Sequence, residues 1–211
     1  EFHERSLNAD LGLALCLDAR AALSTDLRVL VMSATLDGVA VAKLLASSTT
    51  TNAPVISSAG RSFPVDIRYL GKGLPLLPGD AESVERVAGL AVLRALRECE
   101  GDMLVFLPGM AEIRRVKDFI ESAPDFISSK AQALPLHGDL SVESQDEALR
   151  VHSGVRRVIL STNIAETSLT LPGIRVVIDS GLVRRAVFDP ASGMSRLETR
   201  RISRASAAQR A

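Results

Sequence analysis

Aromatic residues are scarce in this chain of 211 residues. They make up 3% of the sequence, and there is no Trp. Proteins that bind nucleic acid by stacking bases, or that hold cations in aromatic cages, need several exposed rings. The composition therefore argues against both modes of binding, although a hydrophobic content of 46% is ample for a folded core.

An excess of charge of one sign is also lacking. The net charge is zero, so there is no overall basic footprint for nucleic acid. The charge is unevenly distributed, however. The last thirty residues hold seven Arg against two acidic residues, a net charge of +5, and the preceding 181 residues carry −5. A basic end of this kind can contact phosphates, or it can be an ordinary solvated surface.

Cysteine and long apolar runs are rare too. Cys16 and Cys99 lie far apart, each inside an apolar helical pattern, and we expect two buried, reduced thiols of a cytoplasmic protein. Three scattered His and no CxxC pair predict no structural zinc site. No apolar run approaches the length of a membrane span, so no membrane partner is expected. Because the chain begins with Glu1 and not with Met, we expect a piece of a longer protein.

Short apolar runs alternate with amphipathic segments along the chain. Strands are predicted at residues 27–32, 54–56, 65–70, 103–107, 131–136, 155–160 and 174–179, and helices at 7–23, 37–45, 80–99, 110–121 and 141–151. Residues 183–188 and 194–199 are expected to form a hairpin. Strands that alternate with helices indicate an α/β fold whose parallel sheet is covered on both faces.

The richest polar stretch is STNIAETSLTLPG, from Ser161 to Gly173. It lies between two strand-like runs, as the connection of a crossover would. Ligands of open parallel sheets bind where strands end. Hydroxyls, an amide and backbone N–H groups at that place suit a chain of phosphates, although a Ser/Thr loop can also be an ordinary capped turn.

Further short motifs follow other predicted strands. They are EFH at residues 1–3, SAT at 33–35, FLPG at 106–109, LHG at 136–138 and QRA at 209–211. Each motif alone is weak, but their order and spacing resemble those of the DEAH-box helicases of superfamily 2. EFHERSL resembles the second motif of that family without its first Asp, and TNIAETSLT resembles the fifth. The resemblance covers the whole chain and is greatest to a bacterial branch of the family.

The resemblance implies two RecA-like domains of the P-loop NTPase class. Residues 1–60 would be the C-terminal remnant of the first domain, and residues 61–211 a nearly complete second one. It also implies ATP and Mg²⁺ as cofactors, and RNA or another single-stranded nucleic acid as the partner. The activity implied is ATP-driven movement along one strand and unwinding of the duplex.

Phosphoryl transfer depends on positioned charge. The resemblance assigns catalytic positions to Glu1, His3, Gln209 and Arg210. Glu1 would polarise the attacking water and hold Mg²⁺ through water, since a carboxylate is a suitable general base. Gln209 would orient the water from the second domain, and Arg210 is the first arginine of the sixth motif.

The other assigned positions couple the domains or contact nucleic acid. Ser33 and Thr35 would link the nucleotide state to closure of the two domains. Contact with the phosphates and riboses, without reading of bases, would come from five residues: His137, Gly138, Thr162, Asn163 and Thr167.

The sequence also departs from the family. It holds no Gly-rich loop with its phosphate-binding Lys, and the sixth motif is cut after Ala211. We therefore expect the 211 residues to be inactive without the remainder of the helicase chain. The alternative is a non-enzymatic RecA-like module that binds nucleic acid or protein.

Overall fold

The computed structural model describes most of the chain. The described residues are 2, 7–23, 26–33, 38–46, 52–58, 63–70, 83–150, 154–166 and 171–211. The backbone divides into two compact units, Glu1–Asp66 and Ile67–Ala211. The domain boundary predicted near residue 60 stays a prediction, and each unit is described by itself.

The first unit contains two helices, α1 (Leu7–Ala22) and α2 (Gly38–Leu45), and both confirm the sequence prediction. A guanidinium N–H of Arg20 donates to the carbonyl of Leu45 at 3.2 Å and ties the two helices together. The strands predicted at residues 27–32 and 54–56 are wrong, because the structure has no strand there. Leu30 is 81% exposed and Met32 67% exposed, so this run is not buried.

The second unit is built on a parallel sheet in the order β2-β3-β1-β4. Its strands are β1 (Asp102–Phe106), β2 (Gln132–Leu136), β3 (Arg157–Ser161) and β4 (Ile174–Asp179). All three pairings are parallel, which confirms the predicted α/β class. The strand predicted at residues 65–70 is wrong, because these residues are described and form no strand.

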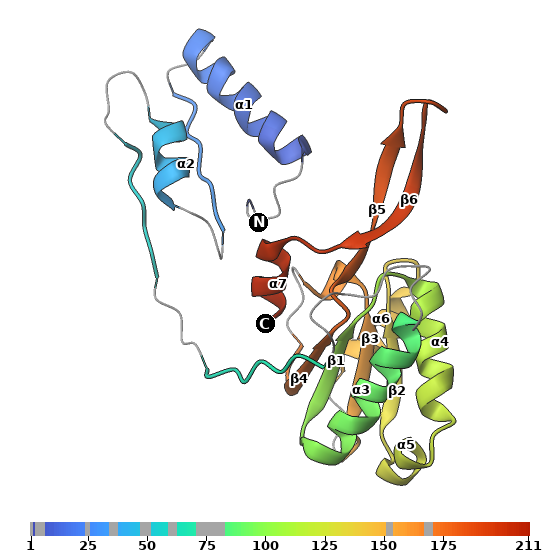
Figure 1. The fold of residues 1–211 in the computed structure, drawn as a ribbon. Coiled ribbons are helices and arrows are strands. Elements are labelled where there is room, and N and C mark those ends of the chain that lie inside the picture. Colours follow the sequence, from blue (N-terminus) through green and yellow to red (C-terminus); the bar gives the residue numbers. More distant parts are fainter. Residues whose placement is uncertain are drawn as a thin grey trace. The chain divides into compact units, whose positions relative to one another are not determined.

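Helices cover both faces of this sheet. On one face, α3 (Val84–Glu98), α4 (Met110–Glu121) and the short α5 (Pro124–Ser129) pack against β1, β2 and β3 around a core that includes Val92, Val105 and Ile113. Figure 1 shows α3 and α4 side by side over the strands. On the other face lies α6 (Val142–Leu149), whose buried Ala148 belongs to a smaller core with Leu134, Leu136 and Ile159. The sheet is therefore buried on both sides, as parallel sheets generally are.

Serine side chains fix the starts of three helices. The hydroxyls of Ser83, Ser141 and Ser203 accept from the backbone N–H three residues on, at 3.3, 3.3 and 3.0 Å. These bonds satisfy donors that the first turn of a helix leaves free. They explain why α3 begins after Ser83, later than predicted.

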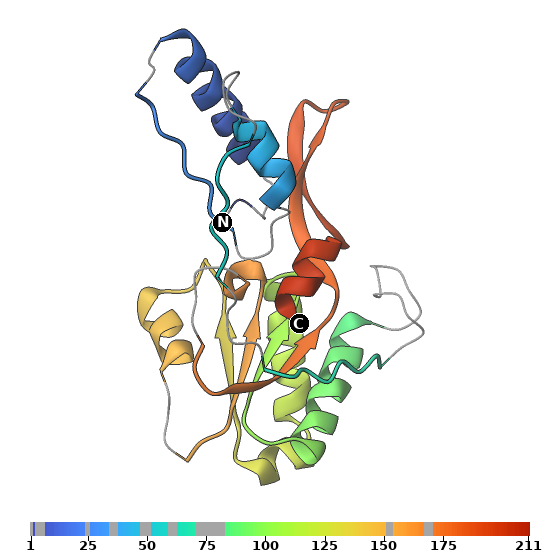
Figure 2. The ribbon, with the colours of Figure 1, turned by 90° about the vertical axis from the view of Figure 1, so that its left-hand side faces the viewer.

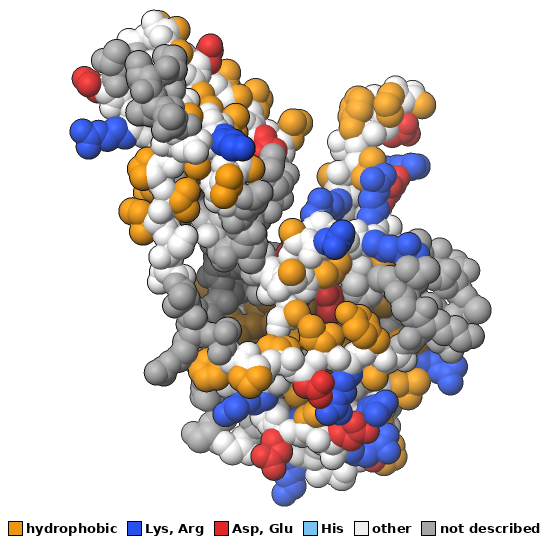
Figure 3. All heavy atoms as spheres, turned by 60° about the vertical axis from the view of Figure 1, so that its left-hand side comes forward, with side chains coloured by type: hydrophobic (Ala, Val, Ile, Leu, Met, Phe, Trp, Pro, Cys, Tyr) orange, Lys and Arg blue, Asp and Glu red, His pale blue; other side chains and the backbone are white. Residues whose placement is uncertain are grey.

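Beyond β4 the chain forms the predicted hairpin, β5 (Leu182–Asp189) and β6 (Met194–Arg201), followed by α7 (Arg204–Arg210). The hairpin projects from the sheet in Figures 1 and 2. Figure 3 shows apolar side chains at its tip and basic side chains along its length. The exposed apolar residues there are Phe188, Met194 and Leu197.

A fully buried arginine closes the amino end of the sheet. Arg157, the first residue of β3, donates from Nε to Asp102 Oδ2 at 2.8 Å, and its backbone N–H donates to Asp102 Oδ1 at 2.8 Å. Its Nη1 donates to the last carbonyls of α6, with the shortest bond, 2.6 Å, to Arg150. Its Nη2 donates to the carbonyl of Pro172 at 2.6 Å. This side chain therefore ties together α6, β1 and the return of the polar loop.

Both cysteines are free thiols, but the prediction that both are buried holds only in part, and only for Cys99. Cys16 is exposed, so the prediction that it is buried is wrong, and Cys99 is half-buried. None of the helices in the described ranges is long and apolar enough to cross a membrane.

Candidate site at the carboxyl edge of the sheet

The four strands of the second unit end at the same level. In the parallel register Leu136 pairs with Ser161, Ser161 with Phe106, and Phe106 with Asp179. The segments that follow these residues therefore leave the sheet along one edge. Helix α7 reaches the same edge, since the guanidinium of Arg210 lies 4.4 Å from the centre of the Phe106 ring.

The segment after β3 begins with two buried polar residues. Ser161 Oγ donates to the carbonyl of Thr162 at 3.0 Å, and the Ser161 carbonyl accepts from Leu107 N–H at 2.8 Å. Thr162 is 7% exposed, whereas Asn163 is exposed at the start of a single 3₁₀ turn, Asn163–Ala165. Of the first two polar residues of the fifth motif, Asn163 is thus the one whose side chain is exposed.

The segment after β2 lies next to this turn. A Cβ on Gly138 would stand 3.9 Å from Cδ1 of Ile164, so the two loops are in van der Waals range. His137 Nδ1 accepts the backbone N–H of Asp139 at 3.1 Å. A neutral imidazole in that arrangement carries its proton on Nε2. The loop that carries His137 and Gly138 is therefore adjacent to the turn that carries Asn163; a shared contact surface for nucleic acid stays a prediction.

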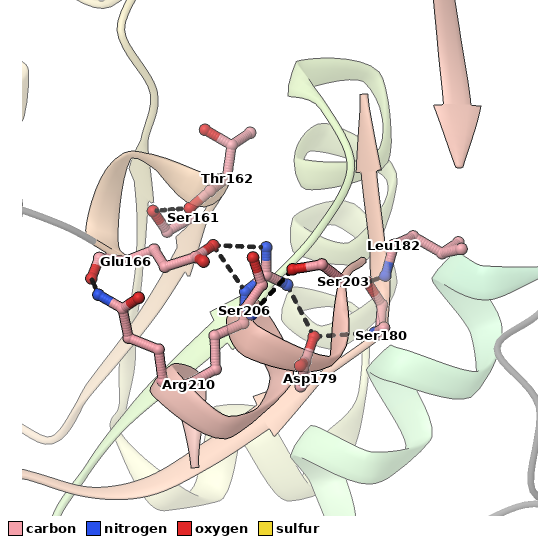
Figure 4. A network of polar contacts seen from close by, with 11 residues as sticks. Ser161, Thr162, Glu166, Asp179, Ser180, Leu182, Ser203, Ser206 and Arg210 are labelled. Atoms are coloured by element: carbon pink, nitrogen blue, oxygen red, sulfur yellow. Dashed lines mark hydrogen bonds and ion pairs between the residues drawn. The ribbon is translucent and has the colours of Figure 1, made fainter. Parts of the chain in front are cut away.

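Arg210 joins three segments of this edge (Figure 4). Its Nε and Nη2 each lie 3.0 Å from Glu166 Oε2, and its Nη1 donates to Asp179 Oδ1 at 2.9 Å. The plane of the guanidinium rests on Phe106. One side chain of α7 thus holds the end of the β3 loop, the end of β4 and the end of β1.

The side chain of Arg210 is more deeply buried than the two carboxylates that it contacts. The Arg210 side chain is 1% exposed, against 11% for Glu166 and 24% for Asp179. A nucleotide phosphate could not reach the guanidinium without displacing both carboxylates. Gln209 is only half-buried, and its amide N–H donates to the carbonyl of Glu166 at 3.2 Å. Both assignments to the nucleotide stay predictions; the structure adds that Arg210 is enclosed by its two carboxylate partners and that Gln209 is more exposed.

The turn between β4 and β5 is held by the same carboxylate. Asp179 Oδ1, which accepts from Arg210, also accepts from the backbone N–H of Gly181 at 2.8 Å. Ser180 N–H donates to the Phe106 carbonyl at 3.2 Å, which continues the sheet contact by one residue. The start of the hairpin is thus fixed to the site.

A second ion pair fixes the hairpin to the FLPG segment. Arg184 of β5 donates to Glu112 Oε1 in the first turn of α4 at 3.0 Å. The approach is close, because a Cβ on Gly109 would stand 2.8 Å from Arg184 Nη1. A glycine at position 109 therefore leaves the space that this ion pair occupies.

Several sequence-predicted positions lie outside the described residues. They are Glu1, His3, Thr35 and Thr167. Ser33 is described and belongs to the first unit. Among the described residues, no group of three or more His, Cys, Asp or Glu side chains could hold a metal ion, and the Mg²⁺ assignment rests on Glu1 alone.

Sequence reasoning missed Glu166 and Asp179. Both are acidic residues in otherwise apolar or neutral surroundings, Glu166 within the polar loop and Asp179 at the end of an apolar strand. Acidic residues in such places are rarely left without a partner when they are shielded from water. That signal could have identified them as partners for a buried arginine.

Comparison with known proteins defines the class of this fold and site. The sequence profile of the helicase conserved C-terminal domain matches residues 85–208, which is more than half of the chain. The chain belongs to this helicase family, and within it to the DEAH-box RNA helicases.

Relatives match over the full length of the chain. It is 48% identical to the ATP-dependent RNA helicase HrpB of Escherichia coli, covering 100% of this chain and 24% of that protein. It is 41% identical to the probable ATP-dependent RNA helicase DHX34 of Homo sapiens, of which it covers 18%. The crystal structure of the E. coli DExH-box NTPase HrpB superimposes with a TM-score of 0.84 at 46% identity, and the chain covers 24% of it.

These matches confirm the predicted RecA-like fold and the family resemblance. The chain spans about a quarter of the length of HrpB. The matches to helicases over the whole chain do not favour the alternative of a non-enzymatic binding module.

Proposed function

We propose that this chain is part of an ATP-dependent RNA helicase that couples ATP hydrolysis to movement along RNA and to unwinding. Residues 1–60 would belong to the first RecA-like domain and residues 61–211 to the second. The observation that carries the proposal is the common level at which Leu136, Ser161, Phe106 and Asp179 end their strands. This register gathers the residues with phosphate-binding chemistry on one edge.

The nucleic-acid contact would be made by the loops after β2 and β3. The amide of Asn163 and the imidazole of His137 are accessible there, and Gly138 lets a backbone approach closely. Thr162 and Thr167 would add a hydroxyl or a backbone N–H. Such groups bind phosphate and ribose without reading bases, which agrees with the shortage of aromatic rings.

The nucleotide contact would come from both domains, with ATP and Mg²⁺ as cofactors. Mg²⁺, when bound, would neutralise charge that develops on the phosphates. Gln209 would orient the attacking water, because its amide is held in place by the carbonyl of Glu166. Glu1 would accept a proton from that water, and His3, Ser33 and Thr35 would connect the ATP site to domain closure.

The test uses the complete parent protein. We expect its steady-state ATP hydrolysis to rise when a single-stranded RNA oligonucleotide is added. Replacement of Glu1 by Gln is expected to abolish hydrolysis while ATP still binds, and Glu100→Gln, at an exposed position of the second unit, serves as the control. Unchanged turnover in Glu1→Gln would contradict the role of Glu1.

The contact with RNA can be tested separately from hydrolysis. Asn163→Ala is expected to weaken RNA binding about fivefold, as expected for the loss of one hydrogen bond. Gln132→Ala removes an exposed amide at the opposite, amino edge of the same sheet and should leave RNA affinity unchanged. Equal affinities for the two variants, measured by fluorescence anisotropy, would place the RNA elsewhere.

The 211 residues alone provide a further test. Because their sequence contains no Gly-rich loop with a phosphate-binding Lys, we expect no ATP turnover by the purified chain. Multiple turnovers, measured as released phosphate, would contradict this expectation.

A further inference from the structure

We propose that Arg210 is a positioning residue that transmits contact with nucleic acid to Gln209 through Glu166. The proposal rests on the proposed function and makes it more specific. It concerns the link between the fifth and sixth motifs and assigns Arg210 no direct contact with ATP.

Several segments meet at the guanidinium of Arg210. Glu166 closes the 3₁₀ turn that begins at Asn163, since its backbone N–H donates to the Asn163 carbonyl at 3.0 Å. The carboxylate of Glu166 accepts from two nitrogens of Arg210. A shift of the turn that carries Asn163 therefore acts on Arg210 through a charge-assisted, two-point contact.

Glu166 is also bonded directly to Gln209. The Glu166 carbonyl accepts the side-chain amide of Gln209 at 3.2 Å. Glu166 thus holds two consecutive residues of α7, one through its carboxylate and one through its main chain. Any displacement of Glu166 moves the amide that the proposed function assigns to the attacking water.

Asp179 and Phe106 keep Arg210 in place. Asp179 Oδ1 accepts from Nη1, and Phe106 covers one face of the guanidinium at 4.4 Å. Both are terminal residues of paired strands, so they form a rigid base. Against this base the turn Asn163–Ala165 is the partner that would shift, because it is a single 3₁₀ turn outside the sheet with an exposed first residue.

The side chain of Arg210 is buried. With its side chain 1% exposed, Arg210 cannot approach a phosphate while both ion pairs are intact. The route that reaches Gln209 from Arg210 runs through Glu166, which contacts both residues.

The experiment compares basal and RNA-stimulated ATP hydrolysis in the complete parent protein. The variants are Arg210→Gln, Glu166→Gln and the double variant. The matched control is Arg204→Gln, which removes an exposed arginine from the first turn of the same helix. For each protein kcat, the KM for ATP, the apparent affinity for a single-stranded RNA oligonucleotide and the melting temperature are measured.

We expect the ratio of stimulated to basal kcat to fall about tenfold in Arg210→Gln and in Glu166→Gln, within the range that coupling between two sites commonly spans. The double variant should lose little more than either single variant, because both remove the same link. The KM for ATP should stay close to that of the unmodified protein. Arg204→Gln should keep the full ratio.

Four outcomes decide the proposal. An unchanged ratio in a folded Arg210→Gln protein would overturn it and leave a purely structural ion pair. A KM for ATP that rises more than tenfold at an unchanged ratio would also overturn it, by showing direct contact with the nucleotide. If Arg210→Gln fails to fold, Glu166→Gln, which keeps the size of the side chain, decides by the same ratio. An unmodified parent that RNA does not stimulate would overturn the proposed function itself, and the coupling with it.

Discussion

Two buried arginines lie at opposite ends of the same sheet, and they differ in what surrounds them. Arg157, at the amino end, has one carboxylate and four main-chain carbonyls as acceptors. Arg210, at the carboxyl end, has two carboxylates and an aromatic ring. Main-chain acceptors cannot move without the fold, whereas the carboxylate of Glu166, at the end of a 3₁₀ turn, can. The first cluster therefore stabilises the unit, and the second is suited to transmit movement.

The largest effect on stability is expected from Arg157→Ala. The substitution removes the guanidinium donors of Asp102 Oδ2 and of the last carbonyls of α6, while Asp102 Oδ1 keeps the backbone N–H of residue 157. We expect a loss of about 3–5 kcal/mol in the free energy of unfolding, which is typical when one partner of a buried ion pair is removed. Urea unfolding of the 211-residue chain, followed by circular dichroism, measures it, with Arg114→Ala at an exposed position of α4 as the control. A loss no greater than that of the control would remove the distinction between the two arginines.

A smaller loss is expected from Arg210→Gln. Glu166 and Asp179 are more exposed than the arginine they hold, so both can regain water when the guanidinium is absent. We expect a loss of about 2 kcal/mol in the same measurement, in line with hydrogen bonds to charged groups. A loss equal to that of Arg157→Ala would mean that both clusters serve stability alone.

Gly173→Ala probes the Arg157 cluster from the backbone. Gly173 has a φ of +90°, and a Cβ there would stand 3.0 Å from Asp102 Oδ2. Gly193 in the hairpin turn has a φ of +66° with open space around it, so Gly193→Ala introduces the backbone strain alone. That strain amounts to about 1–2 kcal/mol. Gly173→Ala should lose more than Gly193→Ala in the same unfolding experiment, and equal losses would show that the cluster yields easily.

The smallest effect is expected at a third arginine cluster, whose arginines are exposed. On β6 the hydrogen bond from Arg200 lowers the pKa of Glu198, with a further contribution from Arg196. Arg200→Gln should raise the pKa of Glu198 toward its ordinary value, measured by NMR titration. Arg201→Gln, also exposed on β6, is the control.

The sign of the pH effect follows from the direction of the shift. Because the pKa of Glu198 is lowered in the folded protein, its contribution to stability is present above the pKa of the unfolded chain. The contribution is lost as the pH falls through the folded pKa. A pKa of Glu198 that does not respond to Arg200→Gln would contradict the hydrogen bonds from Arg200 as the cause.

The second unit was predictable because its signals are local. Continuous apolar runs such as MLVFL at residues 103–107 are typical of strands buried on both faces, and the helices between them show a clear period. The same signal failed at residues 27–32. A strand exists only when neighbours supply a ladder of hydrogen bonds. The backbone N–H of Phe2 donates to the Met32 carbonyl at 3.1 Å, but no strand is assigned at residues 27–32. The prediction that Cys16 is buried failed for a related reason. In a helix rich in Leu and Ala, the sequence does not show which face packs against the rest of the protein.

The site was predictable only in outline. The register that brings the motifs to one edge follows from the parallel sheet, which the sequence indicates. The partners of Arg210 do not follow, because they lie 44 and 31 residues away along the chain. Sequence shows the charge of Arg210 but not its burial, which is the observation behind the positioning role proposed above.

The common level of the strand ends has a consequence for how this protein can vary. Side chains alternate between the two faces of a sheet, so an insertion or deletion of one residue within β1 would turn Phe106 to the other face. Arg210 would then lose its aromatic support, and the segments after β1 would leave the edge out of step with those after β3 and β4. Changes of length in this strand should therefore be tolerated far less than changes of residue type, and insertions should be tolerated best in the turn at residues 190–193.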